Sequence, residues 1–513
     1  MDRQVIIAGG GLAGSEAAWQ LAQRGVAVTL YEMRPARATP AHKTDRLAEL
    51  VCSNSLKSNT PGSASWLLKE ELRRSGSLLL RLADAAAVPG GAALAVDRDR
   101  FAEAVTSTLD EHPLVEVRRE EFCEIPGVDR LTWQPPVDGA AGSPSPHGAP
   151  SNQAVAPLSP AATGPQTSHT DVCATPFSNQ ALVLIATGPL TSDALARQLQ
   201  ALTGSENLAF YDAISPIVDA ETLNMERIFR ASRYGKGGED YLNCPMDERE
   251  YGAFYEALRA AQAVEMHSFE DLRYFEVCLP IEELARRGID TLRFGPMKPV
   301  GLVDPRTGRR PYAVVQLRAE DLRFSSYNLV GFQNHLKFPE QKRIMRMIPG
   351  LENAEFLRFG QIHRNTYVNA PKLLGPDLSL RAAPQVLIAG QLSGVEGYVE
   401  CIATGLLAGL AMAERAKGEA FAPPPRTTAL GSLVHYITHA DPADYQPANI
   451  SFDLLAPIDG LPKSIARDRR ARRERQCERA LADLEAWLES MSGPLGRPSF
   501  VWSGQALRLD SLE

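Results

Sequence analysis

Short apolar runs next to glycine-rich turns open the chain. Residues 4–8, QVIIA, lead into GGGLAG, and residues 12–25 carry alanine and leucine at helical spacing before the stretch ends at Gly25. A second apolar run, VAVTLYE, follows at residues 26–32. Runs of this kind are typical of strands buried on both faces of a parallel sheet. The pattern therefore predicts a strand–helix–strand unit over residues 4–32.

The same strand-to-glycine pattern appears twice more, far along the chain. Residues 181–188 read ALVLIATG, and residues 385–416 begin with QVLIAG and continue as a glycine-containing helical stretch. Helical character is also present at residues 63–86 and 97–112. Residues 205–360 contain clustered aromatic and charged residues without a repeat. Because strands that alternate with helices are typical of a doubly wound sheet, we predict an α/β fold interrupted by an inserted domain.

A change of composition marks residues 134–180. This stretch is rich in Pro, Ser, Ala and Gly and has almost no large apolar residues, so it cannot bury enough surface to offset the entropy of ordering it. We predict a flexible low-complexity insertion there. The proline-rich stretch at residues 421–428, FAPPPRTT, predicts a link to a mainly helical C-terminal tail.

The charge balance and the cysteines narrow the functional classes. The formal net charge of −8 weighs against a protein that binds nucleic acid over its whole surface. A local exception is residues 463–475, KSIARDRRARRER, which fit either a solvated helix face or a patch that contacts phosphates. The seven cysteines are scattered without a C-x-x-C pair, which argues against a disulfide framework and a zinc site. The cysteine pattern therefore predicts no metal partner. Since no apolar run approaches the roughly 18 residues of a membrane span, we also predict a cytoplasmic protein without a membrane partner.

Residues 9–14 form the glycine fingerprint G-x-G-x-x-G between the first strand and the first helix. In such a turn Gly9 permits the tight bend, Gly11 lets the backbone approach a pyrophosphate, and Gly14 allows the helix to pack closely on the strand. The helix N-terminus then stabilises the phosphate charge. Glu32, at the end of the second strand, can accept hydrogen bonds from a ribose. These features predict a dinucleotide site that comprises Gly9, Gly10, Gly11, Leu12, Ala13, Gly14 and Glu32.

A late glycine segment favours FAD over NAD as the bound dinucleotide. Gly390, Gly394 and Gly397 open a helix, where their backbone can contact a flavin or its phosphates. An NAD dehydrogenase usually completes its sheet soon after the fingerprint, whereas this chain returns to the fold near its C-terminus. No second complete fingerprint is present, so a nicotinamide reductant has no Rossmann domain of its own.

We therefore predict a Rossmann-like FAD-binding domain that is interrupted by an inserted α+β domain. The FAD-binding domain is discontinuous and comprises residues 1–133, 181–204 and 361–513, the last of which includes the helical tail. The inserted domain spans residues 205–360, and we assign it to the substrate side of the molecule.

Several longer segments carry a resemblance to a known family. They are IIAGGGLAGSEAAWQLAQRGVAVTLYEMRP, LAELVCSNSLKSN, LLKEELRRSGSL, YLNCPMDEREYGAFYEAL, FGPMKPVGL, LVGFQNHLKFPEQKRI, GQIHRNTYVNAP and GQLSGVEGYVECIATGLLAG. With these segments the chain resembles the folate- and FAD-dependent tRNA (uracil-5-)-methyltransferases over nearly its whole length. The insertion at residues 134–180 departs from the family and lengthens the chain beyond the family's usual size.

The resemblance implies methylation of a T-loop uridine in tRNA to ribothymidine. Methylenetetrahydrofolate supplies the carbon, and FAD reduced by NAD(P)H supplies the hydride. Carbon 5 of uracil is a poor nucleophile, so the reaction needs a thiolate that adds at carbon 6 and a base that removes the proton from carbon 5. The expected partners are tRNA, folate and NAD(P)H.

Two cysteines match cysteines of the family's motifs, Cys52 in ELVCSNS and Cys244 in YLNCPMD. The family pattern favours Cys244 as the nucleophile and Cys52 as the thiol beside the flavin that acts as the base, while the reverse assignment stays open. Both lie in polar, loop-like sequence. Cys278 and Cys401 lack that context, and we interpret them as packing residues.

Basic residues of the middle region are candidates for tRNA contact. Arg306, Arg309 and Arg310 in DPRTGRRPYA suit either phosphate contact or an exposed turn. His363 and Arg364 in GQIHRNTY suit either contact with flavin or folate or a structural role as a His–Arg pair in a loop.

Three other functions are consistent with parts of the sequence. The related FAD and folate enzyme that modifies the wobble uridine of tRNA shares the first fingerprint and a late glycine segment. A small-molecule flavin oxidoreductase suits the acidic net charge but leaves the paired cysteines and residues 463–475 unexplained. A flavin-bound RNA-binding protein without catalysis would not oxidise NAD(P)H.

Overall fold

The computed structural model describes most of the chain. The described residues are 3–39, 41–126, 181–203, 208–213, 215–235, 238–264, 279–360 and 362–491. The predicted insertion at residues 134–180 lies outside them, as do Cys278 and the end of the predicted helical tail, residues 492–513.

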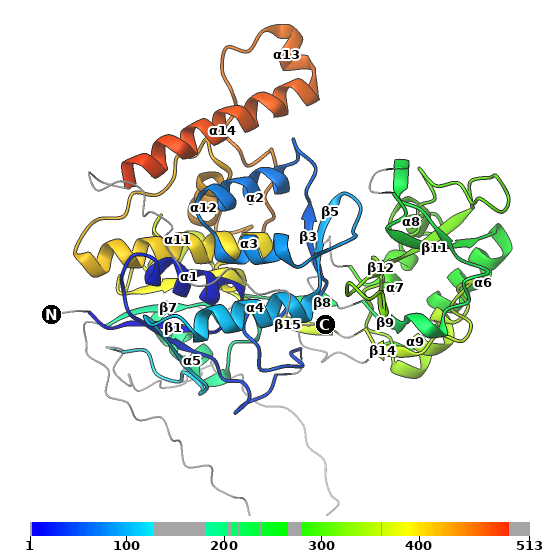
Figure 1. The fold of residues 1–513 in the computed structure, drawn as a ribbon, viewed down its shortest axis with the longest axis horizontal. Coiled ribbons are helices and arrows are strands. Elements are labelled where there is room, and N and C mark those ends of the chain that lie inside the picture. The colour runs from blue at the N-terminus through cyan, green and yellow to red at the C-terminus, as the bar shows by residue number, and fades with distance from the viewer. Residues whose placement is uncertain are drawn as a thin grey trace, which may run out of the picture.

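A five-stranded parallel sheet forms the centre of the first structural unit (Figure 1). Its strands follow the order β16-β7-β1-β2-β6, and each neighbouring pair is parallel. The two strands with late sequence positions therefore continue the sheet that the N-terminus begins. The strands are β1 (Val5–Ala8), β2 (Val28–Tyr31), β6 (Val115–Arg118), β7 (Leu182–Ile185) and β16 (Val386–Ile388).

The predicted strand–helix–strand unit is confirmed, with α1 at Leu12–Ala22 between β1 and β2. The α/β class and the helical C-terminal region are confirmed as well. Residues 63–86 form two helices rather than one continuous helical stretch. Gly76 has a φ of +77°, which ends the first helix, and the Ser77 side chain caps the second by accepting a hydrogen bond from Leu80 N.

A six-stranded antiparallel sheet organises the second structural unit, which lies beside the first in Figure 1. The strand order is β10-β11-β12-β13-β9-β14, and the unit has its own hydrophobic core. Its elements are β9 (Ile217–Asp219), β10 (Phe229–Arg230), β11 (Tyr241–Met246), α6 (Glu248–Arg259), α7 (Ile281–Arg286), α8 (Thr291–Phe294), β12 (Ala313–Ala319), β13 (Ser326–Leu329), α9 (Phe338–Met345) and β14 (Phe356–Arg358). The domain boundaries given above stay a prediction.

An antiparallel pair of strands lies where the chain leaves and re-enters the first unit. Strand β8 (Leu208–Ala213) pairs with β15 (Ile362–Tyr367) along its whole length. The remaining elements are β3 (Ser55–Ser58), α2 (Ala64–Arg74), α3 (Leu78–Ala85), β4 (Ala87–Val88), β5 (Ala93–Val96), α4 (Arg98–Asp110), α5 (Asp193–Thr203), α10 (Ala370–Leu373), α11 (Tyr398–Lys417), α12 (Ala429–His439), α13 (Lys463–Arg467) and α14 (Arg469–Met491).

Helices α1 and α11 pack together at unusually close range. A Cβ added to Gly405 would lie 2.3 Å from the carbonyl oxygen of Ala13, and one added to Gly409 would lie 2.9 Å from Ala17 Cα. The two glycines on α11 therefore let its backbone touch the backbone of α1, which carries the fingerprint turn at its start. None of the helices in the described residues is long and apolar enough to cross a membrane.

Candidate active site

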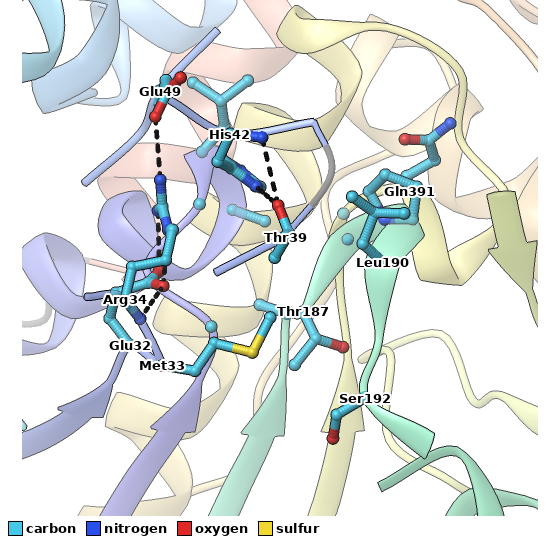
Figure 2. A pocket seen from close by; sticks show the side chains of 18 of the residues that line it. Glu32, Met33, Arg34, Thr39, His42, Glu49, Thr187, Leu190, Ser192 and Gln391 are labelled. Carbon is cyan, nitrogen blue, oxygen red and sulfur yellow. Dashed lines mark hydrogen bonds and ion pairs between the residues drawn. The ribbon is translucent and has the colours of Figure 1, made fainter. Parts of the chain in front are cut away.

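A cleft lies at the carboxyl ends of the parallel strands, which is where open α/β sheets bind their ligands. It encloses about 1040 Å³ of space, part of it open to solvent. The fingerprint turn, the residues after β2 and β7, and the segment after β16 line it. Figure 2 shows how side chains from these separate segments, among them Glu32, Thr187 and Gln391, surround one space.

The fingerprint glycines have different surroundings. Gly9 has a φ of +105°, and an added Cβ would lie 2.6 Å from the carbonyl oxygen of Ala186. A Cβ on Gly14 would lie 1.9 Å from the carbonyl oxygen of Gly9, so any side chain there would force the turn open. Gly11 lines the cleft and has no atom within 4 Å of the place a Cβ would occupy. The turn thus leaves open space at its middle glycine, where a phosphate would approach the backbone.

Glu32 lines the cleft, but its carboxylate already accepts hydrogen bonds from the protein. Arg34 donates from Nε to Oε1 at 2.8 Å and from Nη2 to Oε2 at 3.0 Å, and Gly10 N donates to Oε2 at 3.2 Å. Arg34 also forms an ion pair with Glu49 at 3.0 Å, as Figure 2 shows. Burial alone would raise the pKa of Glu32, but the hydrogen bonds and charge of Arg34 outweigh it and lower that pKa. Glu32 is therefore a fixed carboxylate at the edge of the cleft.

His42 lies beside this cluster. Its Nδ1 is 2.6 Å from Thr39 Oγ1, and both residues line the cleft (Figure 2). Burial, followed by the positive charge of Arg34, lowers the pKa of His42 to about 4. The imidazole is therefore neutral at neutral pH.

Cys52 lies next to the cleft, one residue after the cleft-lining Val51. Its backbone N–H donates to the hydroxyl of Tyr398 at 2.7 Å, and Ser53 N donates to the same oxygen at 3.1 Å. Arg98 donates from Nη2 to the Cys52 carbonyl oxygen at 3.3 Å. These hydrogen bonds hold the loop between the first residues of α4 and α11. The cysteine is half-buried and therefore still accessible.

Positive charge gathers around Cys52 from both structural units. Arg98 forms an ion pair with Glu320 at 2.5 Å, and Arg318 donates from Nε to Asn54 Oδ1 at 2.8 Å. Arg358, at the end of β14, is also within electrostatic range of the Cys52 thiol. The second unit thus supplies both charge and hydrogen bonds to the loop that carries Cys52.

Cys244 has the opposite environment. It is on β11 opposite Val315, is 0% exposed, and belongs to the hydrophobic core of the second unit. Burial, followed by the negative charge of Glu352, raises the pKa of the Cys244 thiol far above its usual range. The two thiols thus differ in position: Cys244 lies in the core of the second unit, and Cys52 lies on a half-buried loop of the first unit.

Comparison with known proteins identifies the family. Residues 4–420 match the family described as glucose inhibited division protein A. The chain is 55% identical to the methylenetetrahydrofolate–tRNA-(uracil-5-)-methyltransferase of Solibacter usitatus, over 95% of this chain and 99% of the relative. The enzymes of the same name from Koribacter versatilis and Symbiobacterium thermophilum are each 52% identical, over 95% and 97% of this chain and 98% and 99% of the relatives.

The chain belongs to the methylenetetrahydrofolate–tRNA-(uracil-5-)-methyltransferase family. Solved structures agree at the level of the fold. GidA from Aquifex aeolicus superposes with a TM-score of 0.62 at 16% identity, over 94% of this chain and 73% of that one.

Only part of the predicted cofactor set of this family member lines the cleft. Gly9, Gly11, Leu12, Ala13, Glu32 and Gly390 do so, the last with a φ of +71°. Gly10 donates its N–H to Glu32, and Gly14 packs on Gly9. Gly394 packs against the Tyr445 hydroxyl, and Gly397 starts α11 beside the ion pair of Lys57 and Glu400. The last two glycines thus shape the turn before α11 without facing the cleft.

Other candidates from the sequence have mixed surroundings. Arg306 forms an ion pair with Asp304 at 2.8 Å, whereas Arg309 and Arg310 are exposed. Cys401 packs against the core of the first unit, as predicted, and it also lines the cleft. His363 and Arg364 are on β15, and their side chains lie outside the described part of the structure.

Four residues of the site have no signature in the sequence. Arg34, Glu49, Arg98 and Tyr398 have no motif that distinguishes them from solvated charges or core aromatics. The one indication in the sequence is that Arg34 follows Glu32 by two residues, because nearby charges of opposite sign at a strand end suggest an ion pair.

Replacement of Tyr398 with phenylalanine tests the support of the Cys52 loop. The ring remains, but two backbone N–H groups lose their acceptor, and each neutral hydrogen bond contributes about 1 kcal/mol. We expect roughly a 10- to 30-fold lower methylation rate with an unchanged FAD content per chain, measured by single-turnover assay and flavin absorbance. An unchanged rate would show that the hydroxyl does not position the loop.

Proposed function

We propose that this chain methylates carbon 5 of a T-loop uridine in tRNA, with methylenetetrahydrofolate as the carbon donor, reduced FAD as the hydride source and NAD(P)H as the reductant. The observation that carries the proposal is the identity of 48–55% to enzymes of this name over almost the full length of both chains. A cleft with a complete dinucleotide fingerprint and an accessible cysteine beside it supports the same reaction.

The residues of the cleft fit an FAD dinucleotide. The N-terminus of α1 and the open space at Gly11 suit the pyrophosphate, and Glu32 lies at the strand end where a ribose is expected. Gly390 and Gln391, from the other end of the chain, face the same space. Bound FAD supplies hydride transfer, and the protein has to hold it next to the two substrates.

The chain's own side chains have two chemical tasks in this reaction. A thiolate sulfur bonds to carbon 6 of the uracil, which makes carbon 5 nucleophilic toward the methylene group of the folate. A base then accepts the proton of carbon 5, and the carbon–sulfur bond breaks as the thiolate leaves.

We propose Cys52 and Cys244 for these tasks. Cys52 is half-buried beside the cleft and surrounded by arginines, whereas Cys244 is enclosed in an apolar core. These surroundings favour Cys52 as the nucleophile, the reverse of the assignment that the family pattern favours. Any chemical role of Cys244 requires the core around it to open when substrate binds.

One assay separates this function from the alternatives. The protein is incubated with a tRNA transcript, methylenetetrahydrofolate and NADPH, and the nucleosides are analysed by mass spectrometry. Ribothymidine in the T-loop is the expected product. Modification of the wobble base would support the related FAD and folate enzyme, and NADPH oxidation without any change of the RNA would support a small-molecule oxidoreductase.

The proposal also covers where the protein works in the cell and what the second unit does in the reaction. A tRNA-modifying enzyme works where mature tRNA, folate and NAD(P)H are present, so we propose the cytoplasm. We also propose that residues 205–360 act on the substrate side, because Arg318 donates to Asn54 and Glu320 pairs with Arg98 next to Cys52.

A further inference from the structure

Two neighbouring loops of the second unit expose large aromatic rings. Tyr234 is 65% exposed, and Phe294, at the end of α8, is 79% exposed. Among the described residues, all large apolar side chains that are exposed belong to this unit, and these two are the most exposed of them. Exposed aromatic side chains in such a setting mark surfaces that bind a partner.

The backbone of Tyr234 is held in an unfavourable conformation. Its φ is +58°, in the left-handed region that only glycine adopts readily. Tyr234 N donates to the Gly301 carbonyl oxygen at 2.9 Å. A Cβ on Gly301 would lie 3.0 Å from the Tyr234 ring, so the ring covers this glycine on one side. Strain of this kind persists where surrounding contacts impose it, and it is concentrated at functional positions.

Arg233 fixes the two loops beneath the ring. It donates from Nε to Gln316 Oε1 at 2.7 Å and from Nη1 to the Val300 carbonyl oxygen at 3.2 Å. Gln316 in turn donates to Asn243 Oδ1 at 3.0 Å. The ring of Tyr234 is therefore presented on a rigid support.

Unpaired positive charge is carried by the segments near this ring and by the turn that follows Gly301. The exposed side chains of Arg230, Lys298, Arg309 and Arg310 have no ion pair or hydrogen bond within the part of the chain that the structure describes. Arg306, on the same turn as Arg309 and Arg310, differs from them in having a carboxylate partner, Asp304. Lys298, Arg309, Arg310 and Tyr234 form what we name the basic–aromatic surface.

Two contacts join the segments that adjoin the basic–aromatic surface. Arg306 donates from Nη1 to the Glu226 carbonyl oxygen at 2.6 Å, and Phe229 packs with Leu302 in a small separate core. The backbones of Asp304 and Arg309 form an antiparallel bridge across the turn that follows Leu302. Arg230 follows Phe229 on β10, so its side chain points to the other face of the sheet.

We propose that the basic–aromatic surface binds an unpaired loop of RNA, with one nucleobase stacked on Tyr234 and phosphates beside Lys298 and the arginines. The proposal rests on the proposed function, which makes tRNA a substrate, and it identifies where the RNA is held. A flat exposed ring suits any nucleobase that is not stacked in a helix, and unpaired cations suit the backbone that carries it. A base-paired duplex offers the phosphates but no free base face.

Binding of two RNAs to the full-length FAD-bound protein tests this. One is a fluorescently labelled T-arm hairpin with its loop, and the other is a labelled blunt duplex of equal length. Their dissociation constants are measured by anisotropy at several salt concentrations. Tyr234→Ala is expected to weaken hairpin binding roughly 5- to 140-fold and to leave duplex binding unchanged, because stacking on a base is lost. Lys298→Ala is expected to reduce the salt dependence by about 0.7 to 0.9 in the slope of log K against log salt.

Three further variants control for folding and for loss of apolar surface. Tyr234→Phe keeps the ring and should bind the hairpin like the parent protein. Tyr234→Gly removes the ring and relieves the positive φ, so it should unfold at a higher temperature while binding the hairpin more weakly. Met347→Ala removes an exposed apolar side chain near α9, which lies at the opposite end of the unit from α8 in Figure 1, and should change neither constant.

The proposal is overturned if Tyr234→Gly binds the hairpin as tightly as the parent protein, or if it weakens the hairpin and the duplex equally. Failure of the proposed methylation can be distinguished from failure of the RNA-binding surface. If the parent protein binds the hairpin but forms no ribothymidine, the proposed function fails and the surface stands. If Tyr234→Gly forms ribothymidine at the parent rate and affinity, the surface fails and the function stands.

Discussion

Replacement of Cys52 with alanine is expected to lower ribothymidine formation by at least about 10³-fold while FAD remains bound. The thiol is half-buried beside the cleft, and Tyr398 and Arg98 hold its backbone there. Alanine keeps those backbone hydrogen bonds and removes only the sulfur. The product is measured by nucleoside mass analysis, and flavin content by absorbance. Full activity of this variant would remove Cys52 from the chemistry.

Two other cysteines serve as comparisons. Cys477 is buried on α14 and does not line the cleft, so Cys477→Ala should methylate at the parent rate. For Cys244, the family pattern predicts that Cys244→Ala loses methylation and keeps flavin.

The burial of Cys244 makes a separate prediction for alkylation. In the tRNA-free protein, iodoacetamide should label Cys52 readily and Cys244 only after unfolding, because Cys244 is 0% exposed and its pKa is raised. Equal labelling rates would mean that the core around Cys244 opens without substrate.

Replacement of Gly405 with alanine is expected to destabilise the protein by about 3 kcal/mol and to lower its FAD content. The new Cβ would lie 2.3 Å from the carbonyl oxygen and 2.6 Å from the Cα of Ala13, and backbone atoms cannot rotate away as a side chain can. The helix α1 must then move, and with it the turn at Gly9 and Gly11 that lines the cleft. Thermal unfolding and the ratio of flavin to protein absorbance measure the two effects.

Gly252 provides a matched control for this substitution. It lies in the interior of α6, and nothing is within 4 Å of the place its Cβ would occupy. Gly252→Ala should stabilise the helix by about 0.5 to 1 kcal/mol, because alanine has the higher helix propensity, and should leave the FAD content unchanged. Equal behaviour of the two variants would contradict close packing of α11 on α1.

The sequence alone determined the features that depend on neighbouring residues. A strand, a glycine turn and a helix within residues 4–32 are specified by hydrophobic spacing and by backbone freedom at a few positions, so the fingerprint unit could be predicted. The strands near residues 181–188 and 385–416 were predictable for the same reason, and so was the α/β class. Family motifs added the expected reaction, because long matches in a fixed order are specific.

Only the tertiary structure decided which distant residues meet. Tyr398 holds the Cys52 loop across 346 residues of sequence, and Arg318 reaches Asn54 across 264. No local pattern encodes such pairs, since they depend on how elements far apart in the sequence are placed in the fold. The same reason explains why the exposure of the two cysteines could not be predicted from the sequence. Their similar polar sequence contexts suggest similar exposure, but strand β11 turns Cys244 into a hydrophobic core, while the Cys52 loop stays at the edge of the cleft.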